Sequence, residues 1–147
     1  MACQKKVKLA IVVSEFNYDI TKIMEEKAVD HARFLGAEVV EVRRAPGTYD
    51  TPILVAKILR KRDVDAVAVL GAVIRGDTDH DQVVAHQAAR KLLDLGVEHG
   101  KPVSLGIIGP GASRLEALER AEEYARRAVE SAVKLAVRLR EMEGNEC

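Results

Sequence analysis

Apolar residues follow two alternating patterns along the chain. Four short segments are continuously apolar and rich in β-branched residues, which is typical of strands buried on both faces of a parallel sheet. The segments between and after them carry apolar residues at helical spacing, which predicts amphipathic helices. The predicted strands are 7–14, 38–43, 65–70 and 102–108, and the predicted helices are 20–35, 52–62, 80–95 and 114–142.

Capping and turn residues set the expected ends of these helices. We expect Asp19 to cap the first helix and Thr51 to cap the second. Gly96 is expected to end the third helix. The Gly-Pro-Gly segment 109–111 predicts a turn, and the capping-box pattern at 113–116 then predicts where the last helix begins.

The alternation of strands and helices predicts a single α/β domain over residues 1–147. We expect a flavodoxin-like three-layer α/β/α sandwich with a four-stranded parallel sheet, an N-terminal arm (1–6) and a C-terminal tail (143–147). Because ligands of such sheets bind beyond the carboxyl ends of the strands, a site is expected in the loops that follow them. These loops span 14–19, 45–51, 71–79 and 106–113.

Charge and composition narrow the expected partners. The chain has 23 basic and 23 acidic residues, so nothing attracts it generally to nucleic acid or membrane, and little self-repulsion opposes a homo-oligomer. Its two cysteines, Cys3 and Cys147, lack metal-ligand spacing and a disulfide framework, which favours a reducing, cytoplasmic location. No apolar run reaches the length of about 18 residues that a membrane span needs. The charged fraction of 31% and the few amides favour a thermophilic source.

The Gly-Asp-Thr segment 76–78 precedes a predicted helix and is a candidate anion site. Free backbone N–H groups and the helix dipole attract phosphate at such a position, and a glycine lets the backbone approach it closely. The same residues also fit a tight turn in which Thr78 accepts from the Asp81 amide. Asp77, Asp79 and Asp81 would repel a phosphate, so a nearby cation would have to offset them. A calcium loop is excluded, because the residues that follow the aspartates do not continue its pattern.

The other candidate residues each have two interpretations. His80 suits proton transfer near neutral pH, or is an ordinary surface histidine. Arg120 and Arg127 lie two helical turns apart and would clamp an anion, or belong to a face of ion pairs with nearby glutamates. Phe16 and Tyr49 fall in loops at the expected site, although aromatic residues make up only 3% of the chain. They would stack on a planar ligand or anchor the loops on the core.

Together these segments resemble the lumazine synthase family over residues 7–142, nearly the whole chain. The Gly-Ala-Val-Ile-Arg-Gly core followed by Thr and His is highly specific, and the Gly-Pro-Gly turn is similar to the archaeal branch. The matching segments are Ser14-Glu15-Phe16-Asn17, Pro46-Gly47-Thr48-Tyr49-Asp50-x-Pro52, 71–80 and Leu118-Glu119-Arg120-Ala121.

The resemblance implies an enzyme that joins 5-amino-6-ribitylaminouracil to 3,4-dihydroxy-2-butanone 4-phosphate. The products would be 6,7-dimethyl-8-ribityllumazine, phosphate and water, and the family uses no metal or organic cofactor. His80 would be the proton donor and acceptor. The matching substrate-binding positions are Phe16 (ring stacking), Asn17, Thr48, Tyr49 and Asp50 (ribityl chain), Ala72, Val73 and Ile74 (main-chain bonds to the uracil), Leu105 (pyrimidine contact, usually Phe), Asp77, Thr78 and Arg120 (phosphate) and Arg127 (where the family has Lys).

The resemblance also implies assembly. In this family the site lies between neighbouring subunits of a pentamer, with the residues that correspond to Leu105, Arg120 and Arg127 supplied by the neighbour. Some members build a capsid from twelve pentamers. Two alternatives on the same fold stay open: an archaeal-type riboflavin synthase that dismutates two lumazines, and a non-catalytic flavin-binding or shell-forming protein. The stretch 75–80 favours the first enzyme, because a riboflavin synthase needs no phosphate pocket.

Overall fold

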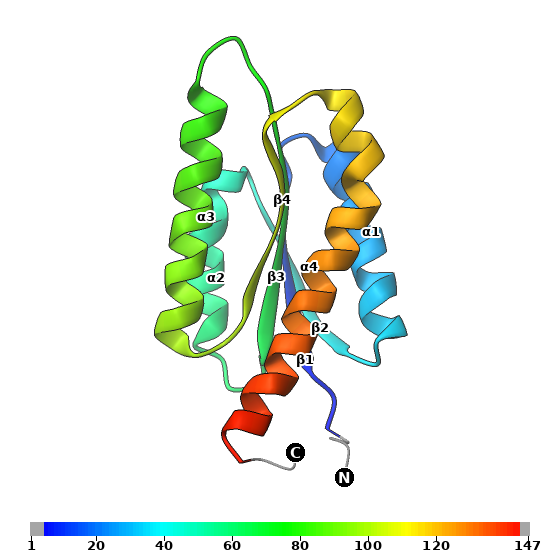
Figure 1. The fold of residues 1–147 in the computed structure, drawn as a ribbon, viewed down its shortest axis with the longest axis vertical. Coiled ribbons are helices and arrows are strands. Elements are labelled where there is room, and N and C mark those ends of the chain that lie inside the picture. The colour runs from blue at the N-terminus through cyan, green and yellow to red at the C-terminus, as the bar shows by residue number, and fades with distance from the viewer. Residues whose placement is uncertain (1–4, 145–147) are drawn as a thin grey trace.

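A four-stranded parallel sheet forms the centre of the protein, with helices packed on both of its faces (Figure 1). The computed structural model describes residues 5–144. Its elements are β1 (Lys8–Ser14), α1 (Tyr18–Phe34), β2 (Glu38–Ala45), the 3₁₀ helix η1 (Thr48–Asp50), α2 (Thr51–Leu59), β3 (Ala66–Ile74), α3 (His80–His99), β4 (Val103–Ala112) and α4 (Arg114–Met142). The strand order is β2-β1-β3-β4, with α1 and α4 on one face and α2 and α3 on the other. The expected three-layer α/β fold with a four-stranded parallel sheet is confirmed.

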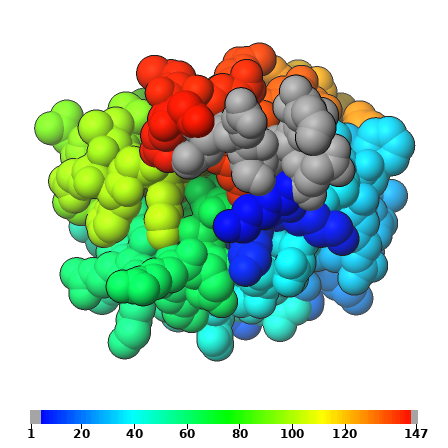
Figure 2. Space-filling view, turned by 90° about the horizontal axis from the view of Figure 1, so that it is seen from below, coloured from blue at the N-terminus to red at the C-terminus, as the bar shows by residue number. Residues whose placement is uncertain are grey.

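The two ends of the described chain lie together, at the edge of the sheet where the strands begin (Figures 1 and 2). Arg140 near the end of α4 donates to the Lys5 and Lys6 carbonyls at 2.8 and 3.2 Å, and to the Asp65 carboxylate at 2.9 Å. Residues 5 and 6 are therefore bound to α4. The rest of the expected arm (1–6), most of the expected tail (143–147) and both cysteines lie outside the described residues.

The side chains of β1 alternate between two cores, which explains why this strand is apolar on both faces. Leu9, Ile11 and Val13 belong to the core under α1 and α4. Ala10 and Val12 belong to the core under α2 and α3. All of these side chains are fully buried, and burial of each larger aliphatic side chain contributes about 1.5–3 kcal/mol.

Helix α4 packs on the sheet through small side chains. At Gly106 of β4, a Cβ would lie 2.8 Å from the Cβ of Ala128, so the glycine permits close approach of helix and strand. The result is a thin layer between α4 and the sheet. The buried residues of α4 are Ala117, Ala121, Ala125, Ala128, Val129, Ala132 and Ala136.

Helix α1 begins earlier than expected. Its N-cap is Asn17 rather than Asp19. Asn17 has a φ of 64°, a left-handed conformation that asparagine tolerates better than most residues. Its carbonyl accepts hydrogen bonds from the Ile20 and Thr21 amides at 2.9 and 3.1 Å. Asp19 instead occupies the first turn, where a carboxylate suits the helix dipole.

The ends of α3 and α2 also differ from the predicted ones. Gly96 does not end α3, which continues to a cap at Gly100 with a φ of 66°. A side chain at Gly96 would meet the Lys101 carbonyl at 3.1 Å, so this glycine serves packing rather than termination. Helix α2 ends earlier than expected, at Leu59, and the Lys101 Nζ donates to the Leu59 and Lys61 carbonyls at its end at 3.0 and 2.7 Å.

The expected caps of α2 and α4 have different outcomes. Thr51 is the first residue of α2 rather than its cap, and its hydroxyl donates to the Thr48 carbonyl at 2.8 Å. The capping box of α4 is confirmed. The Ser113 Oγ accepts from the Glu116 amide at 3.1 Å, and the Glu116 carboxylate accepts from the Ser113 amide at 2.9 Å.

Strands β3 and β4 run further toward the expected site than their apolar runs predict. β3 includes residues 71–74, which were expected in a loop, and β4 includes the Gly-Pro-Gly segment 109–111, which was expected as a turn. The register pairs Ile74 with Ala112, and the Arg75 amide donates to the Ala112 carbonyl at 2.8 Å. This part of the site is therefore sheet rather than loop, although the register shifts between Ala72 and Ile74, so that residues 109–111 form a bulge in β4.

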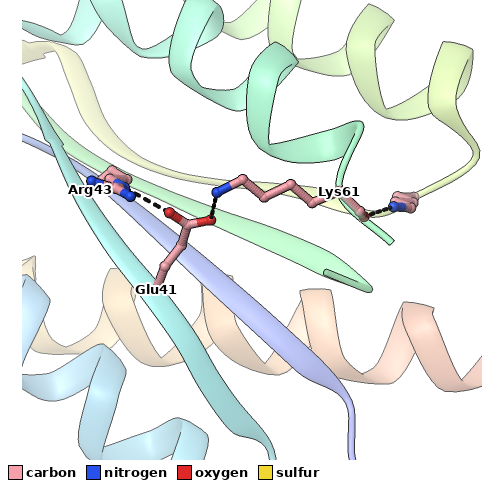
Figure 3. Close-up of polar contacts among 4 residues, drawn as sticks. Glu41, Arg43 and Lys61 are labelled. Carbon is pink, nitrogen blue, oxygen red and sulfur yellow. Dashed lines mark hydrogen bonds and ion pairs between the residues drawn. The ribbon is translucent and has the colours of Figure 1, made fainter. Parts of the chain in front are cut away.

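An ion-pair network links the edge strand β2 to the turn after α2 (Figure 3). The Glu41 carboxylate accepts from the Lys61 Nζ and from the Arg43 Nε, each at 2.7 Å. Lys61, and after it Arg43, lowers the pKa of Glu41 below its ordinary value.

We expect Lys61→Met to lower the free energy of unfolding near neutral pH by about 0.5 kcal/mol, since exposed ion pairs contribute little. A carboxyl with a depressed folded-state pKa stabilises above its unfolded pKa, and that contribution is lost as the pH falls through the folded value. The difference from the native protein should therefore shrink below the ordinary pKa of 4.5. Urea unfolding at neutral and acid pH measures this, with Arg62→Met as the control. An equal difference at both pH values contradicts the assignment.

Candidate functional site

A cavity opens at the carboxyl ends of the strands, the edge where α/β sheets bind ligands. Its volume is about 370 Å³, which lies within the range of small-molecule sites. Its wall is formed by the ends of β1 and β3, by η1 and by the start of α3. The lining residues are Phe16, Gly47, Thr48, Tyr49, Ala72, Val73, Ile74, Gly76, Thr78, His80, Asp81 and Val84.

The fold brings most of the expected site residues of the first three βα loops into this cavity. Gly71 permits β3 and η1 to meet, because a Cβ there would lie 2.8 Å from the Thr48 hydroxyl oxygen. Asp50 lines a neighbouring hollow instead, which shares Tyr49 with the cavity. The expected site residues that do line the cavity are Phe16, Thr48, Tyr49, Ala72, Val73, Ile74, Thr78 and His80.

Two aromatic rings stand at the cavity wall. Phe16 is 59% exposed and Tyr49 is 60% exposed. Rings that anchor loops on the core would be buried, so the structure contradicts that interpretation. Exposed rings beside a cavity suit stacking on a planar ligand.

Asn17 lies next to the cavity and holds the end of β3. Its Nδ2 donates to the Ala72 carbonyl at 2.9 Å, and its Oδ1 accepts from Arg114 at 2.8 Å. Asn17 is not among the lining residues. Since both ends of its amide are engaged within the protein, Asn17 orients the residues around it.

The turn before α3 keeps the features of an anion site. Its N-cap, Asp79, makes no side-chain capping bond, so its carboxylate does not cover the first amides of the helix. The Thr78 hydroxyl accepts from the His80 amide at 3.3 Å, and not from the Asp81 amide as the tight-turn interpretation expected. This helix start borders the cavity through Thr78 and His80.

The three aspartates of this segment have different surroundings. Asp77 and Asp79 are exposed, and Asp77 lies outside the cavity lining. Asp81 is buried, and its Oδ2 accepts from the Gly111 amide at 3.1 Å. This bond ties the first turn of α3 to β4. Sequence spacing did not reveal it, because the partners lie 30 residues apart.

His80 is the first residue of α3, is exposed and lines the cavity. An imidazole in this position can reach a bound ligand, which a histidine elsewhere on the surface cannot. The placement therefore favours the proton-transfer interpretation over that of an ordinary surface histidine.

Leu105 and Arg127 do not reach this cavity. They line a separate hollow of about 400 Å³ over β4 and α4, together with Tyr124. Arg127 also pairs with Glu123 at 3.5 Å, as the ion-pair interpretation expected. The expected site residues therefore fall on two different surfaces of the chain.

Arg120 belongs to the second group. It is exposed on α4 and is not among the residues that line the cavity. The pKa of Glu116 is lowered mainly by the hydrogen bond from the Ser113 backbone, and the charges of Arg75 and Arg120 lower it further. Arg120 is thus a cation near the carboxyl-terminal edge of the sheet, outside the cavity of its own chain.

Residues 5–144 lack two further features, a cluster of metal ligands and a membrane-spanning helix. In that range no three His, Cys, Asp or Glu side chains are grouped as metal ligands. No helix in the described part of the chain combines the length and the apolar character needed to cross a membrane.

Comparison with known proteins shows which family this sequence resembles. The family described as 6,7-dimethyl-8-ribityllumazine synthase matches residues 6–140. A protein of that name from Aeropyrum pernix is 74% identical over 148 aligned residues, covering 100% of both chains. One from Pyrobaculum arsenaticum is 65% identical over 90% of this chain and 88% of its own. One from Methanopyrus kandleri is 59% identical over 95% of this chain and 98% of its own. Because this family model matches nearly the whole length of the chain and the relatives align over 88% or more of their own length, the chain belongs to the 6,7-dimethyl-8-ribityllumazine synthase family.

Proposed function

We propose that the chain condenses 5-amino-6-(D-ribitylamino)uracil with 3,4-dihydroxy-2-butanone 4-phosphate to form 6,7-dimethyl-8-ribityllumazine, phosphate and water. The observation that carries this proposal is the cavity itself. It combines an exposed aromatic ring, the end of a strand and the start of a helix bearing a histidine. A planar pyrimidine, a polar chain and a phosphate would each find a matching wall there.

The pyrimidine substrate would bind on the side of β1, β3 and η1. Phe16 would stack on the ring, and the backbone of residues 72–74 would bond to the uracil edge. The Ala72 carbonyl already accepts a hydrogen bond from Asn17. Val73 and Ile74 would therefore supply more of the backbone hydrogen bonds to the uracil edge. The segment Thr48–Asp50 would hold the ribityl chain, since it borders both the cavity and the neighbouring hollow.

The phosphate substrate would bind at the start of α3, through backbone N–H groups near Asp77 and Thr78. The exposed Asp77 and Asp79 carboxylates oppose an anion there, so a cation must complete this half of the site. Arg120 has the required charge but lies outside the cavity of its own chain. We therefore assign it to the site of a neighbouring copy.

This division of residues supports a homo-oligomer. A site that needs two different surfaces of the same chain can be completed by a head-to-tail contact between copies, and such contacts form a ring when the rotation between the copies closes. The exposed Leu105 and Arg127 would complete the neighbour's site together with Arg120. We propose a cytoplasmic pentamer, alone or as part of a capsid of twelve pentamers. Light scattering would separate these states, and a monomeric mass would contradict all of them.

The chemistry needs proton transfers as well as proximity. Schiff-base formation and phosphate elimination both move protons, and His80 lies beside the proposed phosphate subsite. Holding two substrates in one cavity replaces a bimolecular encounter and supplies much of the acceleration. No residue of the proposed mechanism requires a metal ion or an organic cofactor.

Replacement of His80 by alanine should slow the reaction without abolishing it. General acid–base catalysis contributes about 10²-fold or more to a rate, so we expect kcat to fall by about that factor. The KM of both substrates should change little. His86→Ala, at an exposed position of the same helix, is the matched control. Total loss of turnover in a folded variant with native substrate affinities would contradict this role.

The direct test of the activity is to mix the purified protein with both substrates and follow lumazine absorbance. A rate above the uncatalysed background is expected. A rate equal to the uncatalysed background would contradict the proposal. Incubation with lumazine alone is the second arm, because riboflavin formation there would instead identify a riboflavin synthase.

A further inference from the structure

An arginine at the start of α4 contacts two residues at the start of α1. Arg114 is the first residue of α4. Its Nη1 donates to the Asp19 carboxylate at 2.5 Å, and its Nη2 donates to the Asn17 Oδ1 at 2.8 Å. The planar guanidinium suits this task, because two of its N–H groups address two acceptors at once.

The position of Arg114 is locally unfavourable, which points to a role beyond helix formation. A positive charge in the first turn opposes the helix dipole, and residues that break a local rule are expected mainly at functional places. The capping box of Ser113 and Glu116 fixes the start of α4 and hence the place of Arg114. The Asp19 carboxylate offsets the charge of the arginine.

Arg114 also selects the orientation of the Asn17 amide. An arginine has donors and no acceptor, so the amide oxygen must face the guanidinium. The amide NH₂ then faces the Ala72 carbonyl, to which it donates at 2.9 Å. Without the guanidinium, no group of α4 would hold the amide in this orientation. Because Asn17 directly follows Phe16 in the chain, a change at Asn17 would also affect the position of Phe16.

We propose that Arg114 is a positioning residue for the pyrimidine side of the cavity, acting through Asn17 on the Ala72 carbonyl and on Phe16. This inference rests on the proposed function, in which Phe16 and the end of β3 receive the pyrimidine. The start of α4 is thereby coupled to a wall of the cavity to which it contributes no lining residue.

The first experiment measures two affinities of Arg114→Met. The Kd of 6,7-dimethyl-8-ribityllumazine, followed by its fluorescence without turnover, should rise about fivefold, a modest change because the contact is partly exposed. The KM of the pyrimidine substrate should rise in parallel, while the KM of the butanone phosphate stays within about twofold. Arg114→Lys should rescue part of the loss, since a lysine can still donate to one of the acceptors. Arg138→Met, at an exposed position near the other end of α4, should change nothing.

The second experiment asks whether Arg114 acts through Asn17. Asn17→Gly removes the amide and keeps the left-handed backbone accessible. In that background Arg114→Met should weaken lumazine binding by less than about twofold, because the intermediary is gone. Equal effects of Arg114→Met in both backgrounds, or equal weakening of both substrates, overturn the inference.

The two proposals fail in different ways. A native protein that binds lumazine but does not condense the two substrates contradicts the proposed function. A native affinity for lumazine that Arg114→Met leaves unchanged contradicts the positioning role.

Discussion

Arg120→Ala is expected to raise the KM of the butanone phosphate by about 10- to 150-fold, because hydrogen bonds to a charged group contribute about 1.5–3 kcal/mol. The exposed carboxylates of Asp77 and Asp79 would then face the phosphate without a compensating cation. The KM of the pyrimidine substrate should stay within about twofold, since that substrate lies on the other side of the proposed site.

Steady-state kinetics with one substrate varied at a time would measure both constants. Arg120→Lys keeps the positive charge but loses the planar guanidinium with its several N–H donors. Its KM for the butanone phosphate should therefore lie between those of the native protein and Arg120→Ala. Arg138→Ala, also exposed on α4, controls for the loss of one positive charge. A parallel rise in both KM values would indicate disturbed assembly instead of a phosphate contact.

Gly109→Ala is expected to lower the free energy of unfolding by about 3 kcal/mol or more. Gly109 has a φ of 98°, and a Cβ there would collide with the backbone carbonyl of Val73, which cannot rotate away. The left-handed conformation alone costs an alanine about 1–2 kcal/mol, and the collision adds to this. Since Val73 lines the cavity, a folded variant should also bind lumazine more weakly.

Gly111→Ala is the matched control for this substitution. Gly111 has a φ of 85°, and nothing lies within 4 Å of the position of its Cβ. Its replacement should therefore show the conformational cost alone, about 1–2 kcal/mol. Urea unfolding of both variants gives the difference, and equal losses would show that the contact with Val73 relaxes.

The sequence predicted the order of strands and helices, because the spacing of apolar residues in each element is visible within that element alone. It placed the ends of β3 and β4 wrongly for the opposite reason. Glycine and proline at 109–111 favour a turn by local preference, yet the pairs on either side of them, Ala72 with Ile108 and Ile74 with Ala112, make them a bulge within β4. A tertiary contact of this kind has no signature within a short window of sequence.

In the candidate site, too, the features set by local sequence were predicted and the contacts between distant segments were not. Topology and the loop residues predicted the place of the cavity and most of its lining. The contacts of Asp81 with Gly111 and of Arg114 with Asp19 and Asn17 were missed, because they are hydrogen bonds between distant segments of the chain. The resemblance implied that Asn17 holds the ribityl chain, and the structure adds that its amide bonds to the Ala72 carbonyl and to Arg114.

The buried alanines of α4 affect how the packing of this helix responds to heating. Fixing a long flexible side chain on folding costs up to about 1.5–2 kcal/mol of rotamer entropy, whereas fixing an alanine costs none. This entropic cost grows in proportion to absolute temperature. The layer between α4 and the sheet is built largely from alanine, so its packing carries little of that cost and should persist at temperatures that loosen layers of longer side chains.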